Sequence, residues 1–576
     1  MTSSTSPYRA RVMGTRHMAA AGHYLAAQSA LQVLEAGGNA VDAGCAGGMA
    51  LTVLQSEYVG FAGVAPMMIY LAERDEVVTI AGLGPWPKAA SLDYFHREHD
   101  GAIPPGIMRT VVPAGPDAWI TALERFGTMS FGEVAQFAIR FARDGFPAPR
   151  LMCDILAGYE DQFRRWPSSE AIYMPGGRLP RPGELFVQAD LGRTIQYMAD
   201  QESAARSAGR EAGLAAARDA FYRGDIGLTI ARYHAENGGW MTLEDLDAYR
   251  SPVLPPLTTE FGDTQVFACG PWCQGPMLAQ TLNLLEGIDL GALGHNTADY
   301  IHTVTECLKL AFADRHAYYG DPNFIDVPLD RLLDKAYAAE RRGLVKANEA
   351  CPEMPPAGEI EIAGLPRAAG AAPAPRPAGR EELDTSYICV VDKDGNAFSG
   401  TPSDGSGAAP VIPGLGIVPS TRGSQNNTDP NHPACLAPGK RPRLTPNPAM
   451  AIRDGRWMMP FGSPGNDVQI QAMTQVLMNM LVFGMTPQDA VEAPRFASYS
   501  YPRSSAPFSY SPGELRVESR IDASVADDLA ARGHVMKPWS DWEYPAGAVC
   551  TIVADRETGV MEGGSDPRRP TGVAGW

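Results

Sequence analysis

The feature that most constrains the fold of this chain is a predicted hairpin that directly follows a segment poor in large apolar residues. Residues 351–383 contain Pro355-Pro356 and then a run dominated by Ala, Pro and Gly, which is typical of exposed connections. Residues 385–392 are rich in β-branched and aromatic side chains and lead to the pair Asp394-Gly395. This pattern predicts a strand, a tight turn and a second strand at 397–401. We therefore expect a mobile connection that leads abruptly into the core.

Thr385 opens the predicted strand and carries a hydroxyl group. If the chain were cut before this residue, Thr385 would also gain an α-amine with a pKa of about 7.7 to 8. Such an amine can take the hydroxyl proton near neutral pH and so activate a poor nucleophile. Threonine is also favoured in strands, so this stretch alone favours an ordinary strand residue.

Six further motifs occur in order along the chain. They cover residues 34–43, 309–315, 401–407, 413–419, 437–442 and 462–467. Together with the region around Thr385, their order and spacing resemble the γ-glutamyltransferase family of N-terminal-nucleophile hydrolases, and the resemblance runs through nearly the whole chain. It implies an α/β (α+β) fold, namely a four-layer αββα sandwich of the N-terminal-nucleophile hydrolase type.

The resemblance also implies that the chain cuts itself between Asp384 and Thr385. The Thr385 hydroxyl would attack the Asp384 carbonyl, and water would resolve the resulting ester. Residues 1–384, with the mobile segment 351–383, would form the heavy chain, and residues 385–576 the light chain that begins with the nucleophile. We expect the two chains to form one catalytic unit and to stay associated, singly or as a dimer of such pairs.

The remaining catalytic assignments also come from the resemblance. Ser403 matches a hydroxyl residue that holds the nucleophile. Gly465 and Asn466 lie between a predicted strand and a predicted helix, where free backbone N–H groups suit an oxyanion hole worth about 3 kcal/mol per donor. The family usually has a second glycine at position 466, so the role requires a matching backbone conformation of Asn466. An ordinary turn serine and a structural turn are the alternatives.

Other positions indicate the substrate class. Thr445 matches a substrate-binding hydroxyl, but the family's paired serine is Leu444 here, and Ser463 is also assigned to the substrate. Enzymes of the family that act on γ-glutamyl groups carry an arginine at the position of Leu92 and an acidic residue in the region that here holds Arg422. Arg422 could pair bidentately with a substrate carboxylate. A structural ion pair is the alternative.

These departures resemble the amidohydrolase branch of the family, which includes acylases and oxamate amidohydrolase. We expect an N-terminal threonine amidohydrolase that cleaves an amide of a small, carboxylate-bearing substrate through a Thr385 acyl-enzyme. Transfer of the acyl group to an amine would compete with hydrolysis, and no cofactor is required. A true γ-glutamyltransferase or glutathione hydrolase is one alternative. An uncleaved, catalytically silent binding protein is another.

Composition excludes several classes of partner. The chain has 48 Lys plus Arg and 66 Asp plus Glu, a net charge of −18, with no long basic run, so nucleic acid and anionic membranes are poor partners. No run approaches the roughly 20 apolar residues of a membrane span, and no apolar signal-type region follows the first residues. We expect a cytoplasmic protein. Its nine cysteines, including Cys269 and Cys273, are expected to be reduced thiols rather than zinc ligands.

His302 and Glu306 stand four residues apart on a predicted helix. This spacing suits a metal ion, but no third ligand lies nearby in the sequence, so we expect an exposed pair and no metal site. Apolar periodicity predicts further helices over 23–36, from Asn39 to about 54, and over 467–483. Asp42 stands three residues after Asn39 and predicts a capping box.

Overall fold

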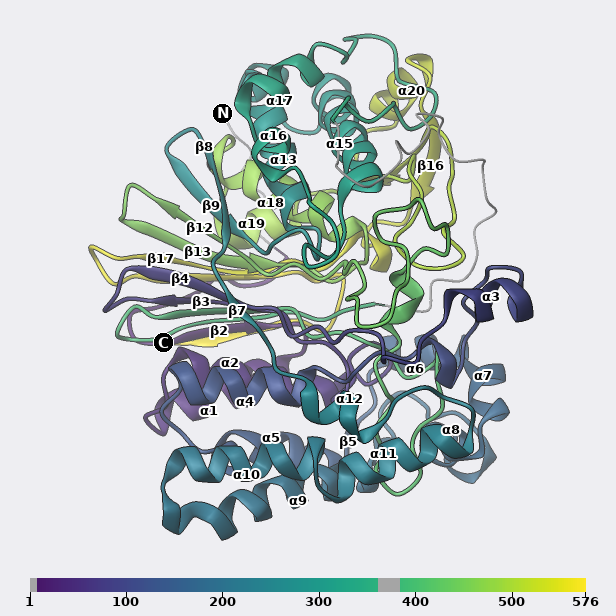
Figure 1. Ribbon diagram of the computed structural model, residues 1–576. Helices are drawn as coiled ribbons and strands as arrows, with labels where there is room; N and C mark the ends of the chain where they lie inside the picture. The colour runs from purple at the N-terminus through teal and green to yellow at the C-terminus, as the bar shows by residue number, and fades with distance from the viewer. Residues whose placement is uncertain (1–7, 361–383) are drawn as a thin grey trace.

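Four stacked layers, in the order helices, sheet, sheet, helices, make up the computed structural model, which describes residues 8–360 and 384–576 (Figure 1). Each central layer is a seven-stranded sheet. The predicted αββα sandwich is therefore confirmed. Most of the predicted mobile connection, residues 361–383, lies outside the described residues.

Both sheets are antiparallel and combine strands from before and after Asp384. The order of the first sheet is β19 (Gly572–Gly575), β2 (Met18–Ala21), β10 (Ile388–Val391), β11 (Ala397–Gly400), β3 (Met67–Leu71), β4 (Glu76–Ile80) and β7 (Val253–Leu254). The order of the second sheet is β1 (Val12–Gly14), β18 (Met561–Ser565), β17 (Cys550–Asp555), β13 (Trp457–Gly462), β12 (Ala449–Arg453), β9 (Thr264–Ala268) and β8 (Leu257–Phe261).

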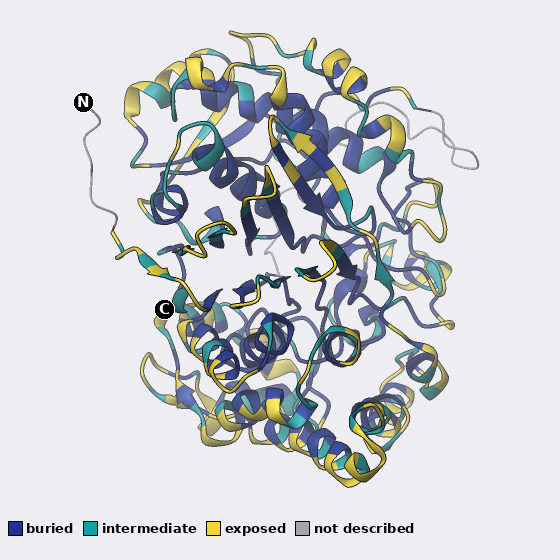
Figure 2. Ribbon diagram, turned by 90° about the vertical axis from the view of Figure 1, so that its left-hand side faces the viewer, coloured by how far each residue is buried: buried dark blue, intermediate teal, exposed yellow. Residues whose placement is uncertain are grey.

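Strand β10 lies inside the first sheet, between β2 and β11. Side chains alternate along a strand, and here Ile388 and Val390 pack towards the helices while Cys389 and Val391 pack between the two sheets. Figure 2 shows these inner strands as buried. Full burial of such an apolar side chain stabilises the fold by about 1.5–3 kcal/mol, so the strand that follows Thr385 is firmly fixed.

Two helical layers cover the outer faces of the sheets. Beside the first sheet lie α1 (Tyr24–Glu35), α2 (Ala40–Leu54) and α4 (Gly115–Phe126), and on their outer side lie α5 (Phe131–Asp144), α9 (Ala189–Ala205) and α10 (Arg210–Tyr222) (Figure 1). Beside the second sheet lie α13 (Gly275–Glu286), α15 (Ala298–Tyr318), α18 (Val468–Leu481) and α19 (Pro487–Glu492). Among the described helices, none combines the length and the apolar character needed to cross a membrane.

Shorter elements complete the two halves. On the side of the first sheet these are α3 (Leu92–His99), β5 (Phe146–Pro147), α6 (Arg150–Ala157), α7 (Glu160–Arg165), α8 (Pro167–Tyr173), β6 (Leu185–Phe186), α11 (Asp225–Glu236) and α12 (Leu243–Ala248). The remaining ones are α14 (Leu290–Leu293), α16 (Leu329–Leu332), α17 (Lys335–Arg342), β14 (Phe496–Ser498), β15 (Glu514–Glu518), α20 (Ala523–Ala531) and β16 (Val535–Trp539).

Several local predictions are confirmed. Asn39 caps α2 in a capping box with Asp42, and every residue of α2 is buried. Gly395 adopts a positive φ of 81° at the turn between β10 and β11. The first strand of the hairpin is shorter than the predicted 385–392, because Thr385 leaves the ladder and pairs with Ser403 in an isolated bridge.

The His23 side chain caps α1, and its Nδ1 accepts a 3.2 Å hydrogen bond from the Leu25 N–H. Burial lowers the pKa of His23 to about 4. Below pH 6.5, His23 therefore binds a proton in the unfolded chain but not in the folded chain. The free energy of unfolding falls as the pH falls from 6.5 towards 4. By this linkage, His23 alone lowers the free energy of unfolding by roughly 2 kcal/mol between pH 7 and pH 5.

His23→Asn keeps a capping acceptor but removes the titration. We predict that the free energy of unfolding, measured by chemical denaturation, drops less between pH 7 and pH 5 in this variant than in the wild type. An equal drop in both proteins would show that His23 does not contribute.

Candidate active site

The peptide bond between Asp384 and Thr385 lies in a buried polar network. Thr385 is 0% exposed. The Asp384 carbonyl oxygen accepts a 2.5 Å hydrogen bond from the Ser403 hydroxyl and a longer one, 3.4 Å, from Arg422 Nη2. These two donors draw electron density from the carbonyl carbon at the predicted cleavage point, and they would stabilise negative charge on its oxygen.

The Thr385 hydroxyl belongs to the same network. Its Oγ1 lies 2.9 Å from Ser403 Oγ and accepts a 3.1 Å hydrogen bond from Gln469 Nε2. A serine hydroxyl has one proton, and Ser403 gives it to the Asp384 carbonyl. Thr385 must therefore donate to Ser403, which links the Thr385 hydroxyl through Ser403 to the carbonyl.

Arg422 supports this network from a fully buried position. Nη2 donates to Ser403 Oγ, and Nε lies 3.7 Å from the Asp404 carboxylate. Burial lowers the pKa of Arg422, although the Asp404 and Asp384 carboxylates oppose this effect. The structure places Arg422 against Ser403 and the Asp384 carbonyl, and its assignment to substrate binding stays a prediction.

The Asp384 side chain occupies a site with four donors. Its Oδ1 accepts hydrogen bonds from the N–H groups of Thr385 (2.8 Å) and Gly465 (3.0 Å). Its Oδ2 accepts from the Tyr544 hydroxyl and lies 2.8 Å from Arg569 Nη2. The Gly465 N–H, predicted as an oxyanion donor, thus already binds a negatively charged oxygen.

Gly465 and Asn466 have φ angles of 119° and 51°, and α18 begins at Val468. Asn466 therefore adopts a left-handed conformation that asparagine tolerates better than most residues. Asn466 thus has the backbone conformation that the family's glycine at this position would adopt easily. The catalytic roles of Gly465 and Asn466 stay predictions.

A cavity of about 280 Å³ opens beside this turn. Three of the predicted site residues line it: Asp384, Gly465 and Asn466. Its lining also includes residues that sequence reasoning missed: Glu57, Tyr58, Tyr159, Tyr499, Tyr544 and Arg569. The one available signal was Glu57, an isolated acid within a largely apolar run.

Glu57 and Arg569 are among the lining residues whose pKa values are shifted. Burial raises the pKa of Glu57 to about 8. Burial acts to lower the pKa of Arg569, but the Asp384 carboxylate and the Tyr544 and Tyr58 hydroxyl groups outweigh it, so that the net shift is upward. In the uncut chain, Arg569 is therefore a cation and Asp384 is its ion-pair partner.

Thr445 and Ser463 lie in the same region but do not line this cavity. The Thr445 hydroxyl accepts a 3.0 Å hydrogen bond from Gln425 Nε2. Ser463 Oγ donates to the Pro464 carbonyl and accepts from the Ala548 N–H, at 2.7 and 3.1 Å. These contacts fix Ser463 within its own turn, and a substrate contact from either residue stays a prediction.

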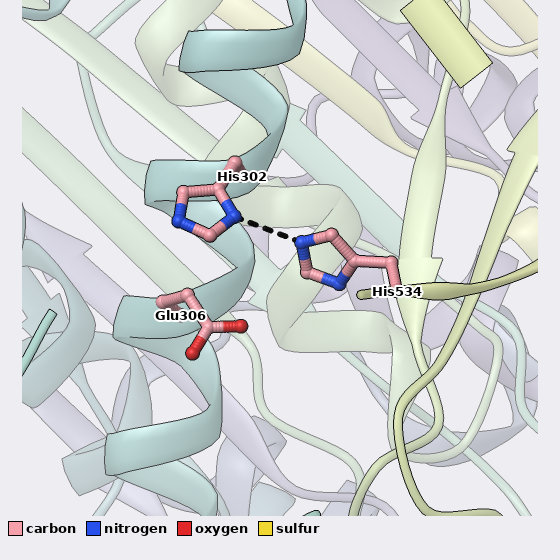
Figure 3. Close-up of side chains that lie close together, drawn as sticks. All are labelled: His302, Glu306 and His534. Atoms are coloured by element: carbon pink, nitrogen blue, oxygen red, sulfur yellow. Dashed lines mark hydrogen bonds between the residues drawn. The ribbon is translucent and has the colours of Figure 1, made fainter. Parts of the chain in front are cut away.

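Figure 3 shows a second polar cluster, formed by His302 and Glu306 of α15 and by His534. The predicted exposed pair is wrong: His302 is 0% and Glu306 5% exposed. One ligand-type atom from each residue lies within 4.8 Å of the others, so His534 supplies the third residue that the sequence did not place. The two rings contact each other directly at 2.9 Å, and Glu306 accepts from Lys309 and the Cys351 N–H. His302 Nε2 also lies 2.7 Å from the Lys346 carbonyl oxygen, whereas His534 Nδ1 has no hydrogen-bond partner among the described residues.

The four-layer fold is that of the N-terminal-nucleophile hydrolases. Within this class, the chain belongs to the γ-glutamyltranspeptidase family, because the family model described as Gamma-glutamyltranspeptidase matches residues 26–576. It is an enzyme of the amidohydrolase and acylase branch, as the following relatives support.

The chain is 32% identical over 565 residues to the glutathione hydrolase-like YwrD proenzyme of Bacillus subtilis (strain 168), covering 97% of this chain and 98% of that protein. It is 32% identical over 536 residues to the acylase ACY 1 proenzyme of Pseudomonas sp. (strain V22), covering 90% and 87%. Among solved structures, the cephalosporin acylase from Bacillus halodurans superposes with a TM-score of 0.85 at 28% identity and covers 100% of this chain and 99% of its own.

Proposed function

We propose that this protein is a self-cleaving amidohydrolase whose nucleophile is Thr385. The observation that carries the proposal is the buried hydrogen-bond chain from the Thr385 hydroxyl through Ser403 to the Asp384 carbonyl. The nucleophile, the carbonyl that it would attack and the group that would polarise that carbonyl lie in one network. The relatives named as proenzymes support the same view.

Cleavage would proceed as an N-to-O acyl shift. Thr385 Oγ1 forms a bond to the Asp384 carbonyl carbon, the C–N bond to Thr385 breaks, and the hydroxyl proton ends on the Thr385 nitrogen. Ser403 and Arg422 stabilise the charge on the carbonyl oxygen during this step. Water then hydrolyses the ester, which leaves a terminal carboxylate on Asp384 and a hydroxyl beside a free amine on Thr385.

The freed amine would then act as the general base for substrate hydrolysis. The Thr385 oxygen attacks an amide carbonyl, the backbone N–H groups of Gly465 and Asn466 stabilise the oxyanion, and the amine returns the proton to the leaving nitrogen. Water finally resolves the acyl-enzyme. These groups complete the reaction without a cofactor.

We also propose that both chains stay together after cleavage. Strand β10 lies between β2 on one side and β11, followed by β3, on the other, so the cut would leave every ladder intact. A cytoplasmic location agrees with nine free cysteines, eight of them buried. A small-molecule amide agrees with a cavity of about 280 Å³.

A γ-glutamyl substrate is the second candidate. The position at which γ-glutamyl enzymes of the family carry an arginine is Leu92, which packs against an apolar cluster that contains Trp86 and Phe95. No arginine from that position therefore reaches a substrate, and this favours another acyl group.

Thr385→Ala should leave the 61.6 kDa chain uncut and inactive, because it removes the hydroxyl oxygen that attacks the Asp384 carbonyl. Thr385→Ser should keep part of the cleavage, since it keeps the hydroxyl. Denaturing gels and amide turnover measure both effects. Cleavage of the alanine variant before residue 385 would contradict the self-cleavage mechanism.

Ser403→Ala should slow cleavage by about 10²- to 10³-fold, because it removes one donor from the carbonyl. The decay of the full-length chain with time measures the rate. Ser399→Ala is the matched control, since Ser399 is an equally buried serine whose hydroxyl bonds to Tyr387 and the Ala449 carbonyl instead. Equal rates in the two variants would remove Ser403 from the mechanism.

The mature enzyme should hydrolyse small carboxylate-bearing amides at least about tenfold faster than a γ-glutamyl anilide, compared as kcat/KM. Release of ammonia or aniline reports turnover. Strong preference for the γ-glutamyl compound would instead establish the second candidate.

A further inference from the structure

The site that holds the Asp384 carboxylate is built for an anion. The Asp384 side chain lies between the Gly465 N–H, the Tyr544 hydroxyl and Arg569. Arg569 is only 3% exposed and lines the cavity of about 280 Å³. Its guanidinium carbon lies 4.2 Å from the centroid of the Tyr544 ring and 5.4 Å from the centroid of the Tyr58 ring. These aromatic rings fix the orientation of the cation.

Asp384 does not pair with both of the guanidinium nitrogens that a carboxylate can bind. Nη2 pairs with Oδ2 at 2.8 Å, whereas among the described residues Nε has no hydrogen-bond partner. The N–H groups of Thr385 and Gly465 both hold Oδ1, which leaves only Oδ2 for the arginine. A free carboxylate can bind Nε and Nη2 side by side.

Cleavage would release the covalent tie that keeps Asp384 in this place. A buried arginine without its carboxylate is left uncompensated, which is costly. Glu57 is the other acid that lines the cavity. With a pKa of about 8 through burial, Glu57 stays largely protonated at neutral pH and does not neutralise Arg569.

We propose that, in the cleaved enzyme, Arg569 and Tyr544 bind the carboxylate of the substrate in place of Asp384, and that the substrates are half-amides of the shortest dicarboxylic acids. This inference rests on the proposed function. It assigns carboxylate recognition to Arg569 in place of Arg422, the residue that the sequence indicated.

The spacing of the donors sets the length of the acyl group. Gly465 binds one oxygen of the Asp384 carboxyl group, and Tyr544 and Arg569 bind the other. If a scissile carbonyl oxygen replaces Oδ1 at the Gly465 N–H, the donors for the substrate carboxylate lie close beside it, which favours a carboxylate attached to that carbonyl carbon or one carbon further. Oxamate and malonamate meet this condition directly, whereas a longer half-amide must fold back on itself at a cost in conformational entropy.

Binding of malonate to uncut chains tests the site without catalysis. Thr385→Ala keeps Asp384 in the site, whereas the double variant Asp384→Ala/Thr385→Ala empties it. By titration calorimetry, the double variant should bind malonate at least about tenfold more tightly than Thr385→Ala. Adding Arg569→Lys should remove this gain, and adding Arg456→Lys, a change at an exposed arginine paired with Asp555, should not. Equal binding in the first two proteins, or a gain that survives Arg569→Lys, would overturn the proposal.

A substrate series on the wild-type enzyme gives a second test that needs no variant to fold. The compounds are oxamate, malonamate, succinamate and glutaramate, and the control for each one is its methyl ester, which keeps the amide but lacks the carboxylate charge. The value of kcat/KM should be highest for the two shortest acids, fall at least about tenfold by glutaramate and be lower still for the esters. A maximum at glutaramate, or equal rates for acids and esters, would contradict it.

The two hypotheses fail in different ways. If the proposed function is wrong, Thr385→Ala is still cut or no amide in the series is hydrolysed. If only the inference about Arg569 is wrong, amides are hydrolysed with no preference for a nearby carboxylate.

Discussion

The hydrogen bond between Ser403 and the Asp384 carbonyl is the interaction on which the rest of the site depends. It brings the carbonyl carbon, the Thr385 hydroxyl and Arg422 into one buried network. Polar groups in such a place must be paired with one another, because no bulk water is available to them. The same pairing that satisfies these groups in the folded chain also polarises the Asp384 carbonyl.

The sheets explain why a cut at this place would be compatible with a stable protein. Strand β10 is held by β2 and β11, and its side chains pack on both faces of the first sheet. Strand β2 belongs to the part of the chain before Asp384 and β11 to the part after it, and β10 would keep its pairing with both after the cut. Breaking the bond would therefore remove one covalent link and change neither the ladders nor the three packed interfaces of the sandwich.

Local patterns predicted local structure well. The Asn39 and Asp42 capping box, the turn at Gly395 and the helix that follows the Gly465 turn all depend on neighbours in the sequence. The position of Glu306 could not be predicted in this way: its helix α15 is buried on nearly all sides, and His534, more than two hundred residues away, completes the cluster around it. The carboxylate site is similar, since Glu57, Tyr544 and Arg569 meet only through tertiary packing.

The proposed mechanism requires that the chain is cut between Asp384 and Thr385. N-terminal sequencing of the purified wild-type protein after prolonged incubation tests it most directly. We expect two N-termini in equal amounts, the second of which reads Thr-Ser-Tyr-Ile from Thr385. A single N-terminus, that of the full-length chain, in protein that hydrolyses amides would contradict it.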